Sequence, residues 1–426
     1  MSGRSRRGLA AIAVGVPALL LAAGIAAPNA VGATPHGTHQ PSEHHFSAAA
    51  RSFVGAHTVR RKVAALEAAT PGLPRLAQAY HTPALWNAGI TGAGTTVATL
   101  VSFGDADIVA VMREYDQANG LPPADISVIS PSGAVPQCSD PGVDTATCQG
   151  WGGETDLDVA MIHTMAPAAK IVIAATPVAE TQGFTGLPEM MHAMDYMTKH
   201  RIADVVSMSF GTTEENFPSL RSIKTLDPAL RRASKAGVTL VASSGDDGAT
   251  GGELYGGNDY PYRVASWPAA DPNVTSLGGT VLHLDANNKR TAADSLWPRS
   301  GAGLSKVYAR PAWQKGVRRA TGSAMRSFPD ITMEGIHGTS ESAPLFGGVL
   351  ALAVQAKHGR LGQINPVLYR KLGRHAARSG IVDVTSGNDN YAGVPGFSAS
   401  TGFDIASGWG TINAAKFVPA LVKAIK

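Results

Sequence analysis

Short apolar runs alternate with helix-period segments from about Leu76 onward, and this pattern limits the possible folds more than any other feature of the sequence. Four runs are rich in β-forming residues and apolar on both faces, as buried parallel strands are: Thr96–Ser102, Lys170–Ala175, Asp204–Ser209 and Val238–Ser243. Segments with helical periodicity lie between them: Asp105–Asn119, Asp156–Met165, Leu187–His200 and Ser222–Lys235. The alternation predicts an α/β fold with a doubly wound, mostly parallel sheet flanked by helices.

The N-terminus has the features of a secretory signal peptide. A basic start, an apolar run and small residues follow one another at Arg4 to Arg7, Leu9 to about Ala27, and Val31 to Ala33. We interpret residues 1–33 as a cleaved signal and expect a secreted, extracellular protein. The alternative is an uncleaved membrane anchor, but the apolar run is barely long enough to span a bilayer and is rich in Ala and Gly.

Residues 34–75 are expected to form a polar linker or short N-terminal tail ahead of one domain over residues 76–426. The tail is rich in histidine and ends in a proline-rich junction at Pro71 and Pro74. Clustered histidines can bind a metal ion. We favour a solvated tail, because no pair of them lies four positions apart on a convincing helix face.

Charge and cysteine content narrow the possible partners. Residues 1–33 contain three arginines and no acids, so their removal lowers the formal charge from +4 to about +1. No cluster of Lys and Arg has interleaved aromatic residues, so we predict no nucleic-acid partner and no stable membrane association after signal cleavage.

The two cysteines, Cys138 and Cys148, lie ten positions apart in an exported chain, which predicts a disulfide.

The strongest local signal for chemistry is the sequence Gly-Thr-Ser-Glu-Ser-Ala-Pro at residues 338–344, followed by a helical run of small residues. A serine between a glycine turn and a helix start presents its hydroxyl at the helix N-terminus. Backbone N–H groups there stabilise a developing oxyanion. Ser340 is therefore the candidate nucleophile. The alternative is a simple helix cap, for which Ser and Thr are favoured.

A serine hydroxyl is a weak nucleophile until a base removes its proton. His337 belongs to the same segment as Ser340, and the Gly-Thr turn between them gives the imidazole no dependable approach to the hydroxyl. Glu154 and Asp158 lie four positions apart where a helix running toward Ala166 is expected to begin, so they share one face. Two such carboxyls share a proton and serve as a base at acidic pH. The alternative is a pair of acids favoured at a helix start by the macrodipole.

A third candidate is Asp246, in the turn Ser-Ser-Gly-Asp-Asp-Gly that follows the apolar strand Val238–Ser243. A carboxyl that stays protonated at the end of a buried strand can donate a hydrogen bond to an oxyanion. Ordinary turn chemistry explains Gly-Asp-Asp-Gly nearly as well.

Together and in this order, the three segments resemble the sedolisin family of serine-carboxyl peptidases. The family pattern is an E-x-x-x-D helix, an S-G-D-x-G loop and a G-T-S nucleophile. Other parts of the chain are similar to the family as well: Leu76–Thr95, Ser207–Gly211 with Glu214, Trp267–Thr280, and Trp297–Ser305 with Ala302 in place of a glycine. The resemblance covers essentially the whole chain after the linker, and it implies a subtilisin-like fold.

The resemblance implies a role for each candidate residue. Ser340 is the nucleophile, Glu154 its general base, Asp158 the carboxyl that orients and tunes Glu154, and Asp246 the oxyanion-hole acid. Family members commonly carry a long N-terminal prodomain, for which the segment before residue 76 is too short. We therefore expect the domain to fold unaided or with a separate helper.

The resemblance also implies one structural Ca²⁺ ion near the C-terminus. The implied ligands are carboxylate and carbonyl oxygens, which suit a hard cation: the side chains of Asp383 and Asp404 and the carbonyls of Val384, Ser400 and Gly402. Serine stands at position 400 where the family has glycine, which a carbonyl ligand tolerates if the backbone angle suits serine. The alternative is a plain Asp-rich turn.

The sequence thus predicts a secreted, acid-active serine-type peptidase that acts on proteins or peptides, most simply as a monomeric endopeptidase. Whether it cleaves internally or releases short peptides from the amino end stays open. A histidine-dependent subtilase is the first alternative, and it needs a separate histidine-bearing helix start that the sequence lacks. The second alternative is a non-catalytic secreted binding protein with the same fold.

Overall fold

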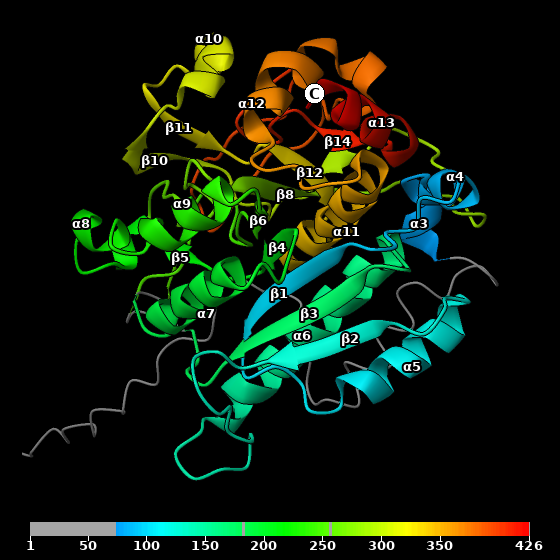
Figure 1. Ribbon diagram of the computed structural model, residues 1–426. Coiled ribbons are helices and arrows are strands. Elements are labelled where there is room, and N and C mark those ends of the chain that lie inside the picture. The colour runs from blue at the N-terminus through cyan, green and yellow to red at the C-terminus, as the bar shows by residue number, and fades with distance from the viewer. Residues whose placement is uncertain (1–73, 181–183, 255–257, 426) are drawn as a thin grey trace, which may run out of the picture. The chain divides into compact units, whose positions relative to one another are not determined.

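A computed structural model of the chain describes residues 74–180, 184–254 and 258–425 (Figure 1). The chain divides into residues 1–40 and residues 41–426, and the described residues all belong to the second unit. The expected signal peptide, residues 1–33, and nearly all of the expected linker, residues 34–75, lie outside the described residues. Among the described residues, no helix combines the length and the apolar character needed to cross a bilayer.

A parallel sheet forms the centre of the described unit (Figure 1). Its strand order is β12-β8-β6-β4-β1-β3-β2, and every neighbouring pair in this order is parallel. The strands are β1 (Thr96–Ser102), β2 (Asp125–Ile129), β3 (Lys170–Thr176), β4 (Val205–Met208), β6 (Thr239–Ser243), β8 (Thr275–Val281) and β12 (Ile331–Glu334). The short strand β9 (Ser295–Leu296) adds to β8 in the antiparallel sense.

Helices cover this sheet in two layers, as the strand-helix alternation predicted. In one layer α6 packs against α11 and both contact β1, and in the other α7 packs against α9. Figure 1 shows α6 running behind β2 and β3. The main helices are α5 (Ile108–Asn119), α6 (Thr145–Met165), α7 (Leu187–Lys199), α9 (Asp227–Lys235), α11 (Thr339–Lys357) and α13 (Ala414–Ala424). The predicted doubly wound α/β fold is confirmed.

The remaining elements are short and lie around this core. The helices and helical turns among them are α3 (Arg75–Ala79), α4 (Thr82–Asn87), η1 (Glu214–Asn216), α8 (Leu220–Ile223), η2 (Ala312–Val317), α10 (Arg318–Thr321), α12 (Asn365–Val367), η3 (Leu368–Leu372) and η4 (Gly373–Ser379). Three antiparallel strand pairs complete the set: β5 (Thr212–Thr213) with β7 (Ser266–Trp267), β10 (Gly303–Ala309) with β11 (Met325–Phe328), and β13 (Ile381–Val382) with β14 (Thr411–Ile412).

The strand order reverses at β1, because β3 and β2 lie on one side of it and β4, β6, β8 and β12 lie on the other. In doubly wound sheets, ligands bind at the carboxyl ends of strands next to such a reversal. The segments that follow β4 and β6 contain Ser209 and Asp246 respectively. The topology therefore brings the predicted site segments to one edge of the sheet.

The start of the acid-bearing helix was predicted wrongly. We expected it to begin at about Gly153, but α6 begins at Thr145, where the side chain of Asp144 caps it by accepting a hydrogen bond from the N–H of Thr147. The glycines at positions 150, 152 and 153 disfavour a helix here, since each costs roughly 1 kcal/mol relative to alanine. Tertiary packing overrides that cost, because α6 is buried almost continuously from Trp151 onward.

The predicted disulfide is confirmed, and it lies at this end of α6. Cys138 and Cys148 are bonded, with their Cα atoms 5.4 Å apart. Cys148 lies in the first turn of α6, so the bond connects the preceding loop to the helix that carries the predicted acids.

Candidate active site

Glu154 and Asp158 lie one turn apart in the middle of α6, and both side chains are buried. Because Glu154 is nine positions beyond the first residue of the helix, the two acids are outside the first turn, where the macrodipole favours negative charge. The interpretation of the pair as ordinary helix-start acids is therefore wrong. Burying two carboxyls in a helix interior is costly, which points to a specific use for them.

Asp158 accepts hydrogen bonds from hydroxyl groups on two different strand segments. Thr99 of β1 donates to its Oδ2 atom, and Ser209, directly after β4, donates to its Oδ1 atom at 2.7 Å. Burial raises the pKa of Asp158 from 3.8 to about 7, and the two hydroxyl donors oppose part of that rise. Below neutral pH the carboxyl is therefore protonated in the folded protein.

Ser340 lies in the first turn of α11 and is fully buried. Gly338, two residues before Ser340, is the N-cap residue of α11. Its φ is +104°, a backbone angle that residues other than glycine rarely adopt. A Cβ atom at position 338 would lie 2.6 Å from Oδ2 of Asp246. Glycine is thus required here both for the turn that presents Ser340 and for the close approach of Asp246.

Asp246 is held against the residue next to Ser340. Its Oδ1 atom accepts hydrogen bonds from the backbone N–H of Thr339 at 2.7 Å and from the Thr339 hydroxyl at 2.9 Å. The N–H of Gly245 lies 3.0 Å from the same Thr339 hydroxyl, so the loop after β6 and the start of α11 are joined at several points. Arg299 donates to the Asp246 carbonyl at 2.8 Å, which holds the loop from the other side.

Helices α6 and α11 cross closely, which brings the acid-bearing and serine-bearing helices together. A Cβ atom at Gly348 of α11 would lie 2.7 Å from the carbonyl oxygen of Ile162 and 2.7 Å from Cβ of Met165, both on α6. The Ser209 hydroxyl adds a link near the serine, since it lies 3.4 Å from the carbonyl oxygen of Ser340. The structure thus places Asp158 on a helix, and Asp246 on a loop, that each contact the helix carrying Ser340.

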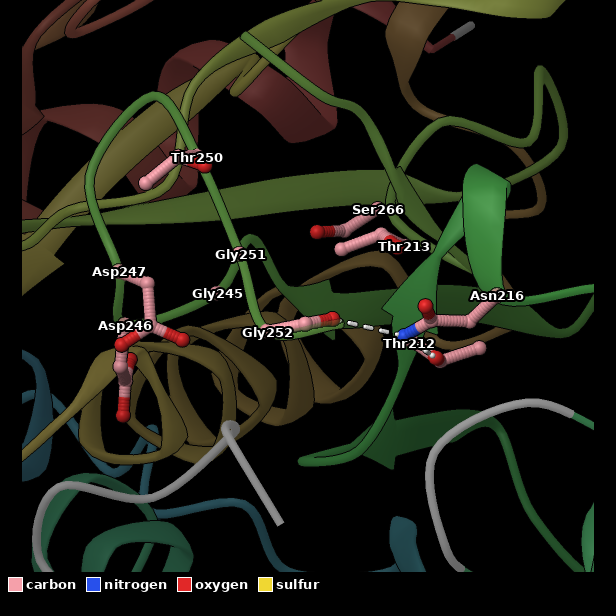
Figure 2. A pocket seen from close by; sticks show the side chains of 10 residues that line it. All are labelled: Thr212, Thr213, Asn216, Gly245, Asp246, Asp247, Thr250, Gly251, Gly252 and Ser266. Atoms are coloured by element: carbon pink, nitrogen blue, oxygen red, sulfur yellow. Dashed lines mark hydrogen bonds between the residues drawn. The ribbon is translucent and has the colours of Figure 1, made fainter. Parts of the chain in front are cut away.

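A polar pocket adjoins this cluster and has about 260 Å³ of open space, its opening to solvent included. Figure 2 shows Asp246 and Asp247 at one end and Thr212 and Asn216 at the other. Asn216 is fixed there, because its amide donates to the carbonyl of Gly252 at 2.9 Å and to the hydroxyl of Thr212 at 3.1 Å. The other lining residues are Thr213, Gly245, Thr250, Gly251, Gly252 and Ser266.

The expected calcium ligands lie on one loop system after β13. The N–H of Gly402 donates to Oδ2 of Asp383 at 2.8 Å, and the N–H of Ser400 donates to Oδ2 of Asp404 at 2.7 Å. Oδ1 of Asp383 is buried and accepts no hydrogen bond from the described residues, and no described backbone N–H donates to the carbonyls of Val384, Ser400 or Gly402. Carboxylate and carbonyl oxygens that accept no such hydrogen bonds are suitable ligands for a hard cation.

Burial raises the pKa of Asp404, and the neighbouring charge of Asp383 adds to that rise. Residues of the loop itself donate hydrogen bonds to both acids. Asp404 accepts three, from the N–H groups of Ser400 and Ser407 and from the hydroxyl of Ser407, and Asp383 accepts one from the N–H of Gly402. Two acids that repel each other in a partly buried loop are most easily ionised together when a cation lies between them.

Sequence reasoning did not identify two residues that organise the site. Thr99 is a polar residue within an apolar strand, and its hydroxyl bonds to Asp158. Thr339 was seen only as part of the serine motif, yet its backbone and side chain both bond to Asp246. A threonine inside a strand that is otherwise apolar on both faces was the available signal for Thr99, because a buried hydroxyl requires a partner.

Comparisons with known proteins identify the family and the fold. The sequence model described as "Subtilase family" matches residues 142–410, a span that includes α6, the loop after β6 and the start of α11. Sedolisin of Pseudomonas sp. (strain 101) is 28% identical over 359 residues, covering 76% of this chain and 57% of that protein. Kumamolisin of Bacillus sp. (strain MN-32) is 28% identical over 401 residues, covering 87% of this chain and 67% of that protein.

Tripeptidyl-peptidase 1 of Bos taurus is 31% identical over 258 residues, which cover 52% of this chain and 43% of that protein. The chain thus spans about half to two thirds of the length of these relatives. A solved structure of Pseudomonas sedolisin, described as a serine-carboxyl proteinase complexed with two molecules of pseudo-iodotyrostatin, superposes with a TM-score of 0.66 at 25% identity. The superposition covers 80% of this chain and 96% of that one.

The parallel sheet, the serine at the start of α11 and the acids on α6 define a protein with the subtilisin-like fold. The chain is similar to sedolisin and kumamolisin over most of its length, which narrows the assignment from the fold to one family. The chain belongs to the subtilase family and, within that fold, to the sedolisin family of serine-carboxyl peptidases.

Proposed function

We propose that this chain is an acid-active serine peptidase that hydrolyses peptide bonds in protein or peptide substrates. Ser340 attacks the carbonyl carbon, Glu154 takes the proton of the hydroxyl, Asp158 orients Glu154, and Asp246 donates to the oxyanion. The observation that carries the proposal is the convergence of three separate segments on the start of α11. Asp246 binds Thr339, and Ser209 lies between Asp158 and the carbonyl of Ser340.

The buried acid pair supplies what a histidine supplies in other serine peptidases. At acidic pH an imidazole is protonated and cannot accept a proton, whereas a carboxylate next to a neutral carboxyl still can. Asp158 is neutral below about pH 7, so the pair as a whole needs to carry only one negative charge in its buried position. Glu154, one turn away on the same face, is then the group that accepts the proton of Ser340.

The contacts of Asp246 support its proposed role as a donor to the oxyanion. Its Oδ1 atom accepts hydrogen bonds from Thr339, and its Oδ2 atom lies close to Gly338. A neutral carboxyl with its proton on Oδ2 donates toward a carbonyl oxygen that approaches Ser340. Such donors act in a site without water, where they contribute more than in solution.

The first test is the digestion of a denatured protein by the wild type and by Ser340→Ala. We expect the wild type to produce peptides at acidic pH and the variant to lose activity by about three orders of magnitude or more. Ser342→Ala is a matched control, because that hydroxyl lies two residues away in the same turn and donates to the carbonyl of Glu334 at 2.7 Å. Sequencing the products would distinguish internal cleavage from release of short amino-terminal peptides.

Full activity of Ser340→Ala would contradict the proposal, and so would peptidase activity that appears only above neutral pH, as a histidine base requires. An absence of cleavage by wild type between pH 3 and pH 7 would favour a binding protein with the same fold. We further propose that the enzyme acts outside the cell, since its N-terminus resembles a signal peptide and its two cysteines form a disulfide. A monomer is the simplest proposal for its oligomeric state.

We also propose that the loop after β13 binds one structural Ca²⁺ ion through Asp383, Asp404 and the carbonyls of Val384, Ser400 and Gly402. Bound calcium would join two segments of this loop system and stabilise the fold by mass action. In 1 mM Ca²⁺ the Tm at pH 7 is expected to exceed that in EGTA by about 3 °C or more. Asp404→Asn should abolish the difference. An equal Tm in calcium and EGTA, measured for the wild type, would contradict the site.

A further inference from the structure

Ser209 occupies a position that the acid pair and the nucleophile share. It directly follows β4 and is buried, and its hydroxyl lies 2.7 Å from Oδ1 of Asp158. The same oxygen lies 3.4 Å from the carbonyl oxygen of Ser340. One side chain therefore contacts both the acid-bearing helix and the turn that carries the serine.

A proline four residues after Ser340 removes the regular helical donor to the Ser340 carbonyl. In a regular helix this carbonyl accepts a hydrogen bond from the N–H of the residue four positions later. That residue is Pro344, which lies inside α11 and has no N–H to donate. The Ser209 hydroxyl is a donor that the structure brings to within 3.4 Å of this buried carbonyl.

A serine hydroxyl carries one proton and two lone pairs, so Ser209 can donate fully to only one of its two neighbours at a time. When Asp158 is ionised, the hydroxyl proton is directed to the carboxylate. When Asp158 is neutral, its own O–H can donate to the Ser209 oxygen, and the Ser209 proton is then directed to the carbonyl of Ser340. The other groups around this carboxyl are the Thr99 hydroxyl from β1 and the ionisable Glu154 on the same face of α6.

We propose that Ser209 is a positioning residue, whose single hydroxyl holds Asp158 of α6 and the carbonyl of Ser340 in fixed relation to each other. It touches neither the substrate nor the reacting atoms. This role rests on the proposed peptidase function and adds a residue to it. Without this hydroxyl, the direct link between Asp158 and the turn that carries Ser340 is lost. A shift of about 1 Å between catalytic groups can reduce the catalytic rate roughly 100-fold.

The test compares Ser209→Ala with Ser207→Ala in the full-length protein. Ser207 lies two residues earlier in β4, is equally buried, and its hydroxyl has no hydrogen-bond partner among the described residues. We expect Ser209→Ala to lower kcat for a peptide substrate roughly 10- to 100-fold while KM stays within about 2-fold. Ser207→Ala should leave both parameters within about 2-fold of wild type.

A second comparison uses Pro344→Ala, which gives the Ser340 carbonyl an intrahelical donor. If Ser209 acts through that carbonyl, the loss caused by Ser209→Ala should shrink by about threefold or more in the Pro344→Ala background. Additive losses would overturn the inference, and so would equal kcat values for Ser209→Ala and Ser207→Ala. If Ser209→Ala does not fold, Ser209→Cys replaces it, because cysteine has a similar size and is only a weak hydrogen-bond donor. If Ser209→Cys also fails to fold, the role of Ser209 is structural and the inference is wrong.

Failure of this inference is distinguishable from failure of the proposed function. If Ser340→Ala is inactive and Ser209→Ala resembles Ser207→Ala, only the role of Ser209 is wrong. If the wild type cleaves no substrate, or if Ser340→Ala retains activity, the peptidase assignment itself is wrong. Thermal unfolding by circular dichroism should show Ser209→Ala and Ser207→Ala within about 3 °C of each other, which separates an effect on kcat from a loss of folding.

Discussion

Asp158 is a buried acid that opposes folding when it ionises. Burial raises its pKa from 3.8 to about 7. A group whose pKa is raised in the folded state binds its proton more tightly there than in the unfolded chain. Its contribution to stability is therefore complete below about pH 4 and is lost as the pH rises through about 7.

Asp158→Asn separates this ionisation from the shape of the side chain, because asparagine has the same size and no charge. The Tm of Asp158→Asn minus the Tm of wild type is expected to increase between pH 4 and pH 8. The value of this difference at pH 4 does not matter for the test. Asp285→Asn is the control, because N–H groups of Lys289 and Asn287 lower the pKa of Asp285. Its ionisation therefore affects stability only in the acid range near and below pH 4, and its Tm relative to wild type should stay nearly constant from pH 5 to pH 8. Differential scanning calorimetry across this range is the measurement. A relative Tm of Asp158→Asn that does not change with pH would rule out a raised pKa.

At the scale of the element, the crossing of α6 and α11 determines whether the acids and the serine can meet. Gly348 lies at the closest point, where a Cβ atom would be 2.7 Å from the backbone of α6. Its neighbour Gly347 faces β1 and β4 instead, where a Cβ atom would lie 3.6 Å from Val97 and 4.0 Å from Val205. These two adjacent glycines therefore have very different space around them.

Gly348→Ala should force the two helices apart, whereas Gly347→Ala adds a methyl group at ordinary contact distance. We expect Gly348→Ala to lower the free energy of unfolding by about 1–3 kcal/mol and kcat by about 10-fold or more. Gly347→Ala should leave stability within about 1 kcal/mol of wild type, since alanine also favours the helix. Chemical denaturation and steady-state kinetics measure the two effects. Equal behaviour of the two variants would show that the crossing does not control the site.

The same scale shows what sequence patterns can predict. Strands β1, β3, β4 and β6 were recognised because they are buried on both faces and therefore apolar throughout. Strand β2 escaped notice because it lies at the edge of the sheet and is partly exposed, so its pattern is less apolar. Strand β8 contains Gly278 and Gly279, which weaken the strand signal.

The candidate site was predictable in its parts more than in its contacts. Ser340, Glu154, Asp158 and Asp246 were chosen from local motifs and from the family resemblance that the comparisons confirm. Their partners lie far away in the sequence, Thr99 in β1 and Ser209 directly after β4. A hydrogen bond between such segments depends on strand order and helix crossing. Neither strand order nor crossing distance is encoded in a local pattern of residues.

Over the whole molecule, several buried acids share the behaviour of Asp158. Burial is the largest cause of a raised pKa at each of them: Glu214, Asp271 and Asp389 have values of about 7, and Asp294 a value of about 6. Asp271 is raised further by the charge of Asp227. They lie in different parts of the described chain, so their effect on folding is a property of the entire unit and not of the active site alone.

These acids predict a protein that is more stable in acid than at neutral pH. Each one favours the folded state fully below about pH 4, where folded and unfolded chains are both protonated, and loses that contribution as the pH rises through 6 to 7. In EGTA, which removes any effect of calcium on the two acids of the C-terminal loop, the Tm at pH 4 should exceed the Tm at pH 8 by about 5 °C or more. The Ser340→Ala variant is the suitable protein for this scan, because it cannot digest itself if the proposed function is right. A Tm that rises steadily from pH 4 to pH 8 would contradict the prediction, because carboxylates with lowered pKa values would then outweigh the buried acids.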